Sequence, residues 1–214
     1  MIVFMSGRIQ NILFDIGQVL VHLDYEQALA RLPAFCDMTS LGAGKRFFAL
    51  MAQDPMIAEY ERGRITSEAY FRHFAEKTGF SGTFDQFVAI WHDIFRENTP
   101  MIHFGHELAR TYDIYFLSNT GEIHFPYLYE AFPALKFCKG DALSCELGVL
   151  KPEKAYYEKA LAKFGLRPES CLFIDDLPEN VAGAERCGIR SILYTAAGET
   201  MAAVRKCLAE GRPG

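Results

Sequence analysis

The stretch Ile9-Gln10-Asn11-Ile12-Leu13-Phe14-Asp15-Ile16-Gly17-Gln18-Val19-Leu20 decides the fold of this chain. Its apolar run predicts a buried β-strand over 9–14 that stops abruptly at the carboxylate of Asp15. Gly17 follows two residues later and permits a tight turn of the backbone. The pattern therefore places Asp15 at the carboxyl end of a strand, where open α/β sheets form their binding crevices.

Two later segments repeat this design of an apolar run that ends in polar side chains. They are Tyr115-Phe116-Leu117-Ser118-Asn119-Thr120 and Cys171-Leu172-Phe173-Ile174-Asp175-Asp176. Helical patterns separate the apolar runs, which indicates parallel strands joined by crossover helices and an α/β fold. We expect strands at 9–14, 114–117, 136–139, 171–174 and 190–194, with a short flap at 19–21. We expect helices of this layer at 99–110, 122–131, 153–164, 180–187 and 201–209.

Between residues 24 and 98 the strand-like runs disappear and amphipathic helical patterns follow one another. The pair Asp54-Pro55 predicts a helix N-cap followed by proline at the first helical position. We expect helices at 25–32, 44–53 and 55–61, after Thr66, and at 83–95. The aromatic side chains of this segment are interpreted as its hydrophobic core, so the segment is predicted to form a helical subdomain inserted after the first strand.

The composition is that of an ordinary globular protein. The chain has 214 residues, of which 50% are hydrophobic and 23% charged, and a net charge of −5 without any basic run. Nucleic acid is therefore not expected as a partner, because binding to its phosphates requires clustered Lys and Arg. The apolar start at 1–8 is too short for a signal sequence and no stretch reaches transmembrane length, so we expect a cytoplasmic protein with no membrane partner.

The six cysteines form no C-x-x-C pair, and several lie within apolar runs. We expect them to be reduced and mostly buried thiols.

The adjacent carboxylates Asp175 and Asp176 are the most demanding feature of the sequence. They follow a buried strand directly and repel each other, which is costly unless a cation or strong hydrogen-bond donors lie beside them. Mg²⁺ is a good candidate, since it prefers carboxylate oxygens and water as ligands. The alternative is that Asp176 caps the helix that starts near Leu177-Pro178, but capping would use only one of the two carboxylates.

Each of the other polar positions has a structural and a functional interpretation. Asp15 is either a turn residue or a nucleophile and metal ligand, and the segment 118–120 is either a polar turn or a set of donors facing the crevice. Lys151 is either a solvated surface charge or the group that neutralises a phosphate. Asn180 either opens its helix or orients a carboxylate, Lys151 or the phosphate. Weaker candidates are Arg62, Arg64 and His124.

Taken together, these segments resemble the motifs of the haloacid dehalogenase-like (HAD) hydrolase superfamily. The motifs are Phe14-Asp15-Ile16-Gly17-Gln18-Val19-Leu20, Leu117-Ser118-Asn119-Thr120, Lys151-Pro152, and Ile174-Asp175-Asp176 with Asn180. Their order and approximate spacing agree over 9–193. The insertion resembles the C1-type cap of that superfamily, and the segment 61–66 resembles its small sugar-phosphatase branch, the glucose-1-phosphate phosphatase-like group.

The resemblance implies a Rossmann-like core at 1–23 and 99–214 with a helical cap at 24–98. It also implies Mg²⁺-dependent hydrolysis of a small phosphate monoester, a sugar phosphate, through an aspartyl-phosphate on Asp15. Ser118 and the Asn119 backbone would hold the phosphoryl oxygens, and Lys151 would offset their charge. The metal would lie between Asp15, the carbonyl of Gly17 and Asp176, with Asp175 acting through water. The partner implied is a small phosphorylated metabolite, and the oligomeric state is not indicated.

One position departs from the family pattern. Most phosphatases of this superfamily carry a second Asp two residues after the nucleophile as general acid and base, but here that residue is Gly17. His22, Asp24 or a residue of the cap could supply the proton instead, or the leaving group could be acidic enough to need less help. The alternatives are a metal-independent 2-haloacid dehalogenase, a lapsed enzyme that only binds, and a mutase. The sequence does not name the substrate.

Overall fold

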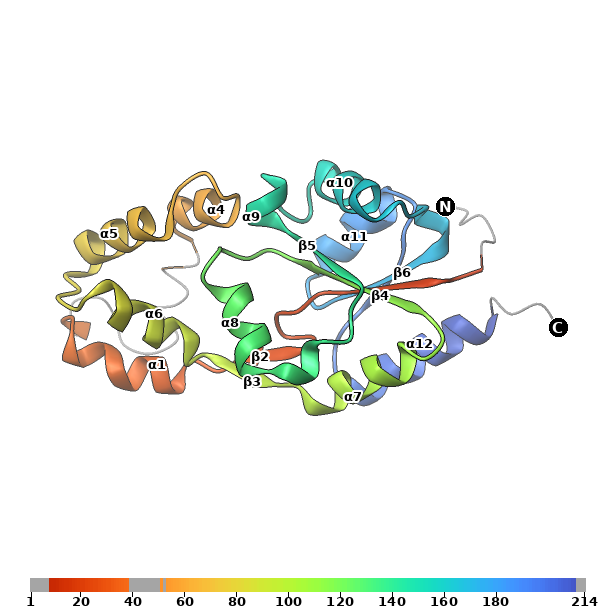
Figure 1. Cartoon of the computed structure of the whole chain (residues 1–214), viewed down its shortest axis with the longest axis horizontal. Coiled ribbons are helices and arrows are strands. Elements are labelled where there is room, and N and C mark those ends of the chain that lie inside the picture. The colour runs from red at the N-terminus through yellow and green to blue at the C-terminus, as the bar shows by residue number, and fades with distance from the viewer. Residues whose placement is uncertain (1–7, 39–50, 52, 211–214) are drawn as a thin grey trace.

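The structure, a computed structural model, describes residues 8–38, 51 and 53–210. In this part of the chain five parallel strands form a sheet in the order β5-β4-β1-β6-β7 (Figure 1). The strands are β1 (Asn11–Phe14), β4 (Asp113–Ser118), β5 (Gly140–Leu143), β6 (Cys171–Asp175) and β7 (Arg190–Leu193). The predicted α/β fold with a parallel, Rossmann-like sheet is confirmed. None of the helices in the described residues is long and apolar enough to cross a lipid bilayer.

The first strand lies at the centre of the sheet and aligns its two neighbours. Phe14 is in register with Phe116 of β4 on one side and with Ile174 of β6 on the other. Since all three strands are parallel, their carboxyl ends meet at the same edge of the sheet. The polar residues at these strand ends are therefore brought together, although Asp15 lies more than one hundred residues before Ser118 and Asp175 in the sequence.

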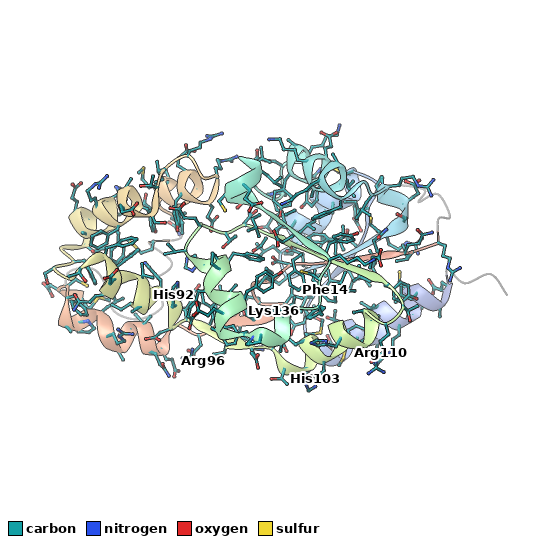
Figure 2. The ribbon with its side chains drawn as sticks, in the orientation of Figure 1. Phe14, His92, Arg96, His103, Arg110 and Lys136 are labelled. Carbon is teal, nitrogen blue, oxygen red and sulfur yellow. The ribbon has the colours of Figure 1, made fainter. Side chains whose placement is uncertain are left out.

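Two layers of helices cover the sheet (Figure 1). The helices of these layers are α7 (Thr99–Leu108), α8 (His124–Ala131), α9 (Ser144–Leu147), α10 (Lys154–Phe164), α11 (Pro178–Arg186) and α12 (Ala197–Glu210). Side chains alternate along a strand, so Phe14, labelled within the sheet in Figure 2, shares one core cluster with Phe104 of α7 and Val204 of α12. Leu13 shares the other with Tyr157 of α10. Burial on both faces makes the strands apolar throughout.

Within residues 8–38, 51 and 53–98, four helices lie to one side of the sheet, and we call them the cap helices (Figure 1). They are α1 (Glu26–Arg31), α4 (Pro55–Glu61), α5 (Ser67–Thr78) and α6 (Phe84–His92). Aromatic rings form their shared core, for example Phe74 against Phe87 with centroids 5.0 Å apart and Phe71 against Phe87 at 5.3 Å. The prediction that these aromatic side chains form a core is confirmed. The helix predicted at 44–53 lies almost entirely outside the described residues.

The end of the helix predicted at 83–95 is wrong. The helix α6 stops at His92, and the chain enters strand β3 (Phe95–Glu97), which pairs antiparallel with β2 (Val21–Leu23). Figure 2 shows His92 and Arg96 near this junction. The spacing of Trp91, Ile94 and Phe95 fits a continuing helix, so periodicity alone could not mark the change. The segment 24–98 is therefore not free of strands.

The strand predicted at 136–139 is also wrong. A 3-10 turn at Pro133–Leu135 precedes these residues, and the strand that pairs with β4 begins at Gly140. Phe137 instead turns its ring into the core, where it packs edge-on against Phe14 and Phe116. Apolar content at 136–139 thus reflects burial without strand pairing.

All six cysteines are free thiols, as expected. Only Cys36 and Cys171 are fully buried, and the other four are partly buried, so the expectation that most are buried is wrong.

Two glycines let the cap helices approach the sheet layer closely. Gly63, with φ of +66°, follows α4, and a Cβ atom there would lie 2.2 Å from the carbonyl oxygen of Cys145. A Cβ atom on Gly121 would lie 2.0 Å from the ring of Tyr60. Since real Cβ atoms do not come this close to other atoms, both positions require glycine in this arrangement.

The helix α4 is anchored at its first turn by Asp54. The Asp54 carboxylate accepts from the Met56 backbone at 3.0 Å, from Lys77 at 2.7 Å and from His73 at 2.7 Å. Burial alone would raise the pKa of Asp54, but these hydrogen bonds outweigh it and lower the pKa to about 2. The predicted N-cap is confirmed.

Replacing Asp54 with asparagine is expected to lower the free energy of unfolding by about 1–2 kcal/mol at neutral pH, because the cap and the hydrogen bonds from Lys77 and His73 are weakened. A carboxyl whose pKa is depressed on folding stabilises above its unfolded pKa, and this stabilisation is lost as the pH falls from about 4 to about 2. Thermal melts of Asp54→Asn and the wild type should therefore converge over that range. The exposed Asp85→Asn in α6 is the control, and a difference that persists at pH 2 would contradict the account.

Candidate active site

Three carboxylates gather where β1 and β6 end. Asp15 follows β1, Asp175 closes β6 and Asp176 follows it, and one oxygen from each lies within 4.8 Å of the others. Asp15 and Asp175 are buried, with exposed fractions of 7% and 0%, while Asp176 is partly exposed. Such a cluster is electrostatically costly unless positive charge lies beside it.

Lys151 provides that charge. Its Nζ atom lies 2.8 Å from Asp15 Oδ1 and 2.7 Å from Asp175 Oδ2, and it donates to the carbonyl of Leu117 at 3.0 Å. Burial would lower the pKa of Lys151, but the two carboxylates outweigh it and the pKa is raised. The surface interpretation of Lys151 is thus wrong, because the ammonium is buried and all three of its N–H donors have partners.

Asp175 is held on both of its oxygens. Oδ1 accepts from the Leu177 backbone at 2.9 Å and from Asn180 Nδ2 at 2.9 Å, and Oδ2 accepts from Lys151 and from the same Asn180 nitrogen at 3.1 Å. A carboxylate has about four lone-pair sites, so these contacts nearly fill it. Asp176 is hydrogen-bonded by its own backbone N–H and by the Asp15 side chain, and it lines the adjacent cavity. Asn180 thus orients a carboxylate, one of the roles considered for it.

The cluster still carries more negative charge than one lysine balances. Burial raises the pKa of Asp15 to about 7, against the opposing effect of Lys151 and with the added repulsion of Asp175. Burial and then the charge of Asp175 also raise the pKa of Asp176. Closely spaced, under-neutralised carboxylate oxygens are what a hard divalent cation such as Mg²⁺ binds, so the residues fit that ion.

The end of β4 supplies the opposite wall of the site. Asn119 holds the Lys151 segment, because its Oδ1 accepts from the Lys151 N–H at 2.9 Å and its Nδ2 donates to the Lys151 carbonyl at 3.0 Å. The N–H of Thr120 donates to Ser144 Oγ at 2.9 Å. Ser118 is buried and lines the cavity beside Asp15. The sequence did not indicate Ser144, whose partner lies 24 residues away.

These residues open into a cavity of about 570 Å³ between the sheet edge and the cap helices. The sheet edge contributes Asp15, Ser118, Asn119, Lys151 and Asp176 to its lining. The cap helices contribute chiefly apolar and aromatic side chains, together with the carboxylate of Glu61. The cavity is partly open to solvent, so a small molecule can reach Asp15 from outside.

The two arginine candidates do not reach this cavity. Arg62 pairs with Glu153 at 2.6 Å, and Arg64 pairs with Glu59 at 3.0 Å and lines a separate cavity of about 380 Å³. Neither His22 nor Asp24, considered as proton donors, lines the active cavity: His22 is exposed and Asp24 lies 3.7 Å from Arg96.

His124 and Glu61 do line the cavity. The Nδ1 atom of His124 is buried and has no hydrogen-bond partner in the described part of the chain, and burial lowers its pKa to about 4, so the ring is neutral. Glu61 ends α4 and was missed as a site residue, although it stands within the segment 61–66 that carried the family resemblance.

The chain is similar in sequence to known proteins that are named as hydrolases of phosphate esters. The chain is 24% identical over 190 residues to a D-ribitol-5-phosphate phosphatase of Bacteroides thetaiotaomicron, with 86% of this chain and 90% of the relative covered. It is 26% identical over 201 residues to flavin mononucleotide hydrolase 1 of Arabidopsis thaliana, with 87% and 73% covered.

Among solved structures, a HAD family enzyme of B. thetaiotaomicron in complex with magnesium and inorganic phosphate superposes with a TM-score of 0.74 at 26% identity. The match covers 88% of this chain and 95% of that one. Residues 9–188 match the haloacid dehalogenase-like hydrolase family. This match spans most of the sequence and includes all three strand ends that form the site. The chain therefore belongs to the haloacid dehalogenase-like hydrolases.

Proposed function

We propose that this protein is a Mg²⁺-dependent phosphatase that hydrolyses a small phosphate monoester through an aspartyl-phosphate on Asp15. The observation that carries the proposal is the position of Asp15 at the end of the central strand. There it lies 2.8 Å from the Lys151 ammonium, beside two further carboxylates, and lines the cavity.

The metal would be held by Asp15, Asp176 and the carbonyl of Gly17, with Asp175 acting through water. This assignment follows the donors already present, since Asp175 is nearly filled by protein hydrogen bonds and Asp176 is not. When bound, Mg²⁺ supplies positive charge that offsets the phosphoryl oxygens and the clustered carboxylates.

Each of the remaining groups has a defined task. The Asp15 carboxylate attacks phosphorus, which replaces one difficult displacement by water with two easier steps. Ser118 and the Asn119 backbone N–H hold the phosphoryl oxygens, and Lys151 offsets their charge while keeping Asp15 in place. The hydrogen bonds of Asn119 to the Lys151 backbone keep these two loops at a fixed separation.

The division into a core at 1–23 and 99–214 and a cap at 24–98 forms part of the proposal. The cap would close the cavity over the phosphate and select the leaving group. Contacts already link the two parts, among them the Arg62–Glu153 ion pair and the bond from Ser67 Oγ to Glu122 at 2.6 Å.

The substrates named for the two relatives have a chemical feature in common, which supports a narrower class of substrate for this protein. D-ribitol 5-phosphate and flavin mononucleotide are both phosphate esters of a primary hydroxyl on a ribityl chain. We therefore propose a sugar or sugar-alcohol phosphate with a linear polyol next to the ester. The cavity of about 570 Å³ is within the range of small-molecule sites.

A phosphate-release assay over a panel of metabolites tests the proposal. The panel contains D-ribitol 5-phosphate, flavin mononucleotide and glucose 1-phosphate, each with Mg²⁺ or with EDTA, and 2-chloropropionate as the dehalogenase control. Mg²⁺-dependent phosphate release from at least one ester is expected. Chloride release without metal, or no turnover of any ester, would contradict the proposed function.

Replacing Asp176 with asparagine is expected to weaken Mg²⁺ binding by roughly 10–100-fold or more, since a charged ligand becomes a neutral one. The measurement is isothermal titration calorimetry with MgCl₂, supported by the shift in melting temperature that Mg²⁺ produces. Glu179→Gln, an exposed acid three residues further along, is the control and should bind Mg²⁺ as the wild type does. An Asp176→Asn protein with unchanged Mg²⁺ affinity would remove this residue from the metal site.

A further inference from the structure

We propose that Glu61 is the general acid and base of the reaction, donating a proton to the leaving alcohol and then accepting one from the attacking water. The inference rests on the proposed phosphatase function. It assigns to the cap the task that the second aspartate performs in most phosphatases of the family and that Gly17 cannot perform.

The position of Glu61 is the first argument. It is the last residue of α4 and lines the same cavity as Asp15 and Lys151. The described part of the chain offers its carboxylate neither a hydrogen bond nor an ion pair. The arginines that follow it are engaged elsewhere, because Arg62 pairs with Glu153 at 2.6 Å and Arg64 with Glu59 at 3.0 Å. Glu61 therefore has a free carboxyl group in the reaction chamber.

The surroundings of Glu61 suit proton exchange near neutral pH. Burial raises its pKa to about 7, and the positive charge of Lys151 opposes this effect. The other ionisable groups that line the cavity are, from the sheet edge, Asp15, Lys151 and Asp176, from the cap helices and their flanks, Tyr25, Tyr60 and Tyr70, and from α8, His124. A carboxyl at the end of a helix also meets the negative end of the helix dipole, which favours its protonated form.

The alternatives within the cavity are less suitable. Burial lowers the pKa of His124 to about 4, so the ring is a neutral imidazole at neutral pH and does not act as an imidazolium acid. Burial raises the pKa of Tyr25, Tyr60 and Tyr70, so these phenols stay protonated and cannot act as bases. Among the ionisable groups that the structure places around this cavity, apart from those assigned to the phosphate and the metal, Glu61 alone can both give and take a proton.

The space at Gly17 is the second argument. A Cβ atom built on Gly17 would have no other heavy atom within 4 Å, so a side chain there would fit. Gly17 is not among the glycines with positive φ, so a substitution is not strained by the backbone. No steric clash therefore explains why this chain lacks the aspartate that most phosphatases of the family carry at the position of Gly17. The space that this aspartate side chain would fill is open to a group from the cap.

The proton balance of the two steps is complete with Glu61. In the first step the Asp15–phosphorus bond forms, the phosphorus–oxygen ester bond breaks, and the departing oxygen takes the Glu61 proton to give the alcohol. In the second step water attacks phosphorus, its proton passes to the Glu61 carboxylate, and the Asp15–phosphorus bond breaks. Inorganic phosphate leaves, and both carboxyl groups return to their starting states.

The test compares two esters that carry no hydroxyl groups. n-Butyl phosphate has a strongly basic leaving group that requires a proton, and 4-nitrophenyl phosphate has a weakly basic one that does not. Glu61→Gln is expected to slow single-turnover cleavage of the butyl ester by roughly 10²–10⁴-fold. The initial burst of 4-nitrophenolate should keep its wild-type rate, followed by a slowed steady state as the aspartyl-phosphate accumulates.

The pH profile gives a second readout. For the butyl ester, the wild-type rate should fall above pH 7 as Glu61 loses its proton, and Glu61→Gln should lack this limb. Glu59→Gln, two residues earlier on the same helix and partly exposed, is the matched control and should behave as the wild type. Recovery of butyl phosphate cleavage in the double variant Gly17→Asp/Glu61→Gln would support the assignment.

Equal slowing of both esters, no slowing of either, or a rise in KM alone would overturn the role of Glu61. Glu61→Asp replaces the glutamine variant if that variant does not fold. Its shorter side chain withdraws the carboxyl and should slow cleavage of the butyl ester selectively. Equal slowing of the two esters in Glu61→Asp would again overturn the role of Glu61. A wild-type protein that cleaves no ester contradicts the proposed function itself. A wild type that cleaves both, with no selective loss in the variant, contradicts only the assignment of Glu61.

Discussion

Asp15→Asn is expected to lower the rate of phosphate-ester hydrolysis by roughly 10⁴-fold or more, because the nucleophile is removed and its partners cannot replace it. The same variant should be more stable than the wild type at pH 7 without metal. Folding raises the pKa of Asp15 from 3.8 to about 7, so the native state binds the proton more tightly than the unfolded chain does. Stability from this group is present at low pH and is lost as the pH rises from about 4 to about 7.

Urea unfolding across that pH range, with EDTA present, measures the effect on stability. The asparagine variant, which cannot ionise, should lack the decline that the wild type shows. Asp113→Asn is the control, because that carboxylate lies at the opposite end of the neighbouring strand and is partly exposed. Hydrolysis at an undiminished rate by Asp15→Asn would show that another group attacks phosphorus.

Lys151→Met is expected to lower the free energy of unfolding by roughly 3–5 kcal/mol at neutral pH, because it leaves buried carboxylates without their cation. Hydrolysis should also fall by roughly 10²–10³-fold or more, since the charge that faces the phosphate is lost. At acidic pH the carboxyls take up protons, so the destabilisation should become smaller there. Denaturant titrations at two pH values, without metal, measure both effects.

Lys154→Met is the matched control for this change. Lys154 lies three residues further along, and its ion pair with Glu158 at 2.8 Å is exposed to solvent. Exposed pairs of this kind contribute about 0.3–0.5 kcal/mol, so the control should unfold almost as the wild type does. Equal stability of Lys151→Met and Lys154→Met would show that the buried cluster is neutralised by protonation and does not depend on the lysine.

Much of the fold could be predicted from the sequence because its signals are local. A buried strand that ends at a carboxylate is visible in the segments around Asp15 and Asp175, and the parallel topology then brings the two ends together. The strand at Gly140 could not be found in the same way. Its residues Gly140-Asp141-Ala142-Leu143 have weak strand propensity and are strand only because they pair with β4.

The residues of the candidate site also differ in whether local sequence signals could predict them. Asp15, Lys151, Asp175 and Asp176 follow from motif spacing, and the contacts among them are what those motifs imply. Glu61 could not be identified as a candidate site residue. Its place in the cavity depends on the direction of α4, and its free carboxylate depends on which carboxylates pair with the nearby arginines. These are properties of cap packing, which no spacing rule along the chain describes.

The close approach of the cap helices to the sheet layer at Gly63 and Gly121 gives a criterion for comparing homologous sequences. A homologue with larger residues at both aligned positions cannot seat its lid against the hydrolase body as this protein does, whatever its catalytic motifs. Such a sequence is expected to hold its counterpart of α4 at a greater distance from the sheet layer, even when its counterparts of Asp15 and Lys151 align. Two positions without side chains thus carry information about helix placement that the reactive residues do not.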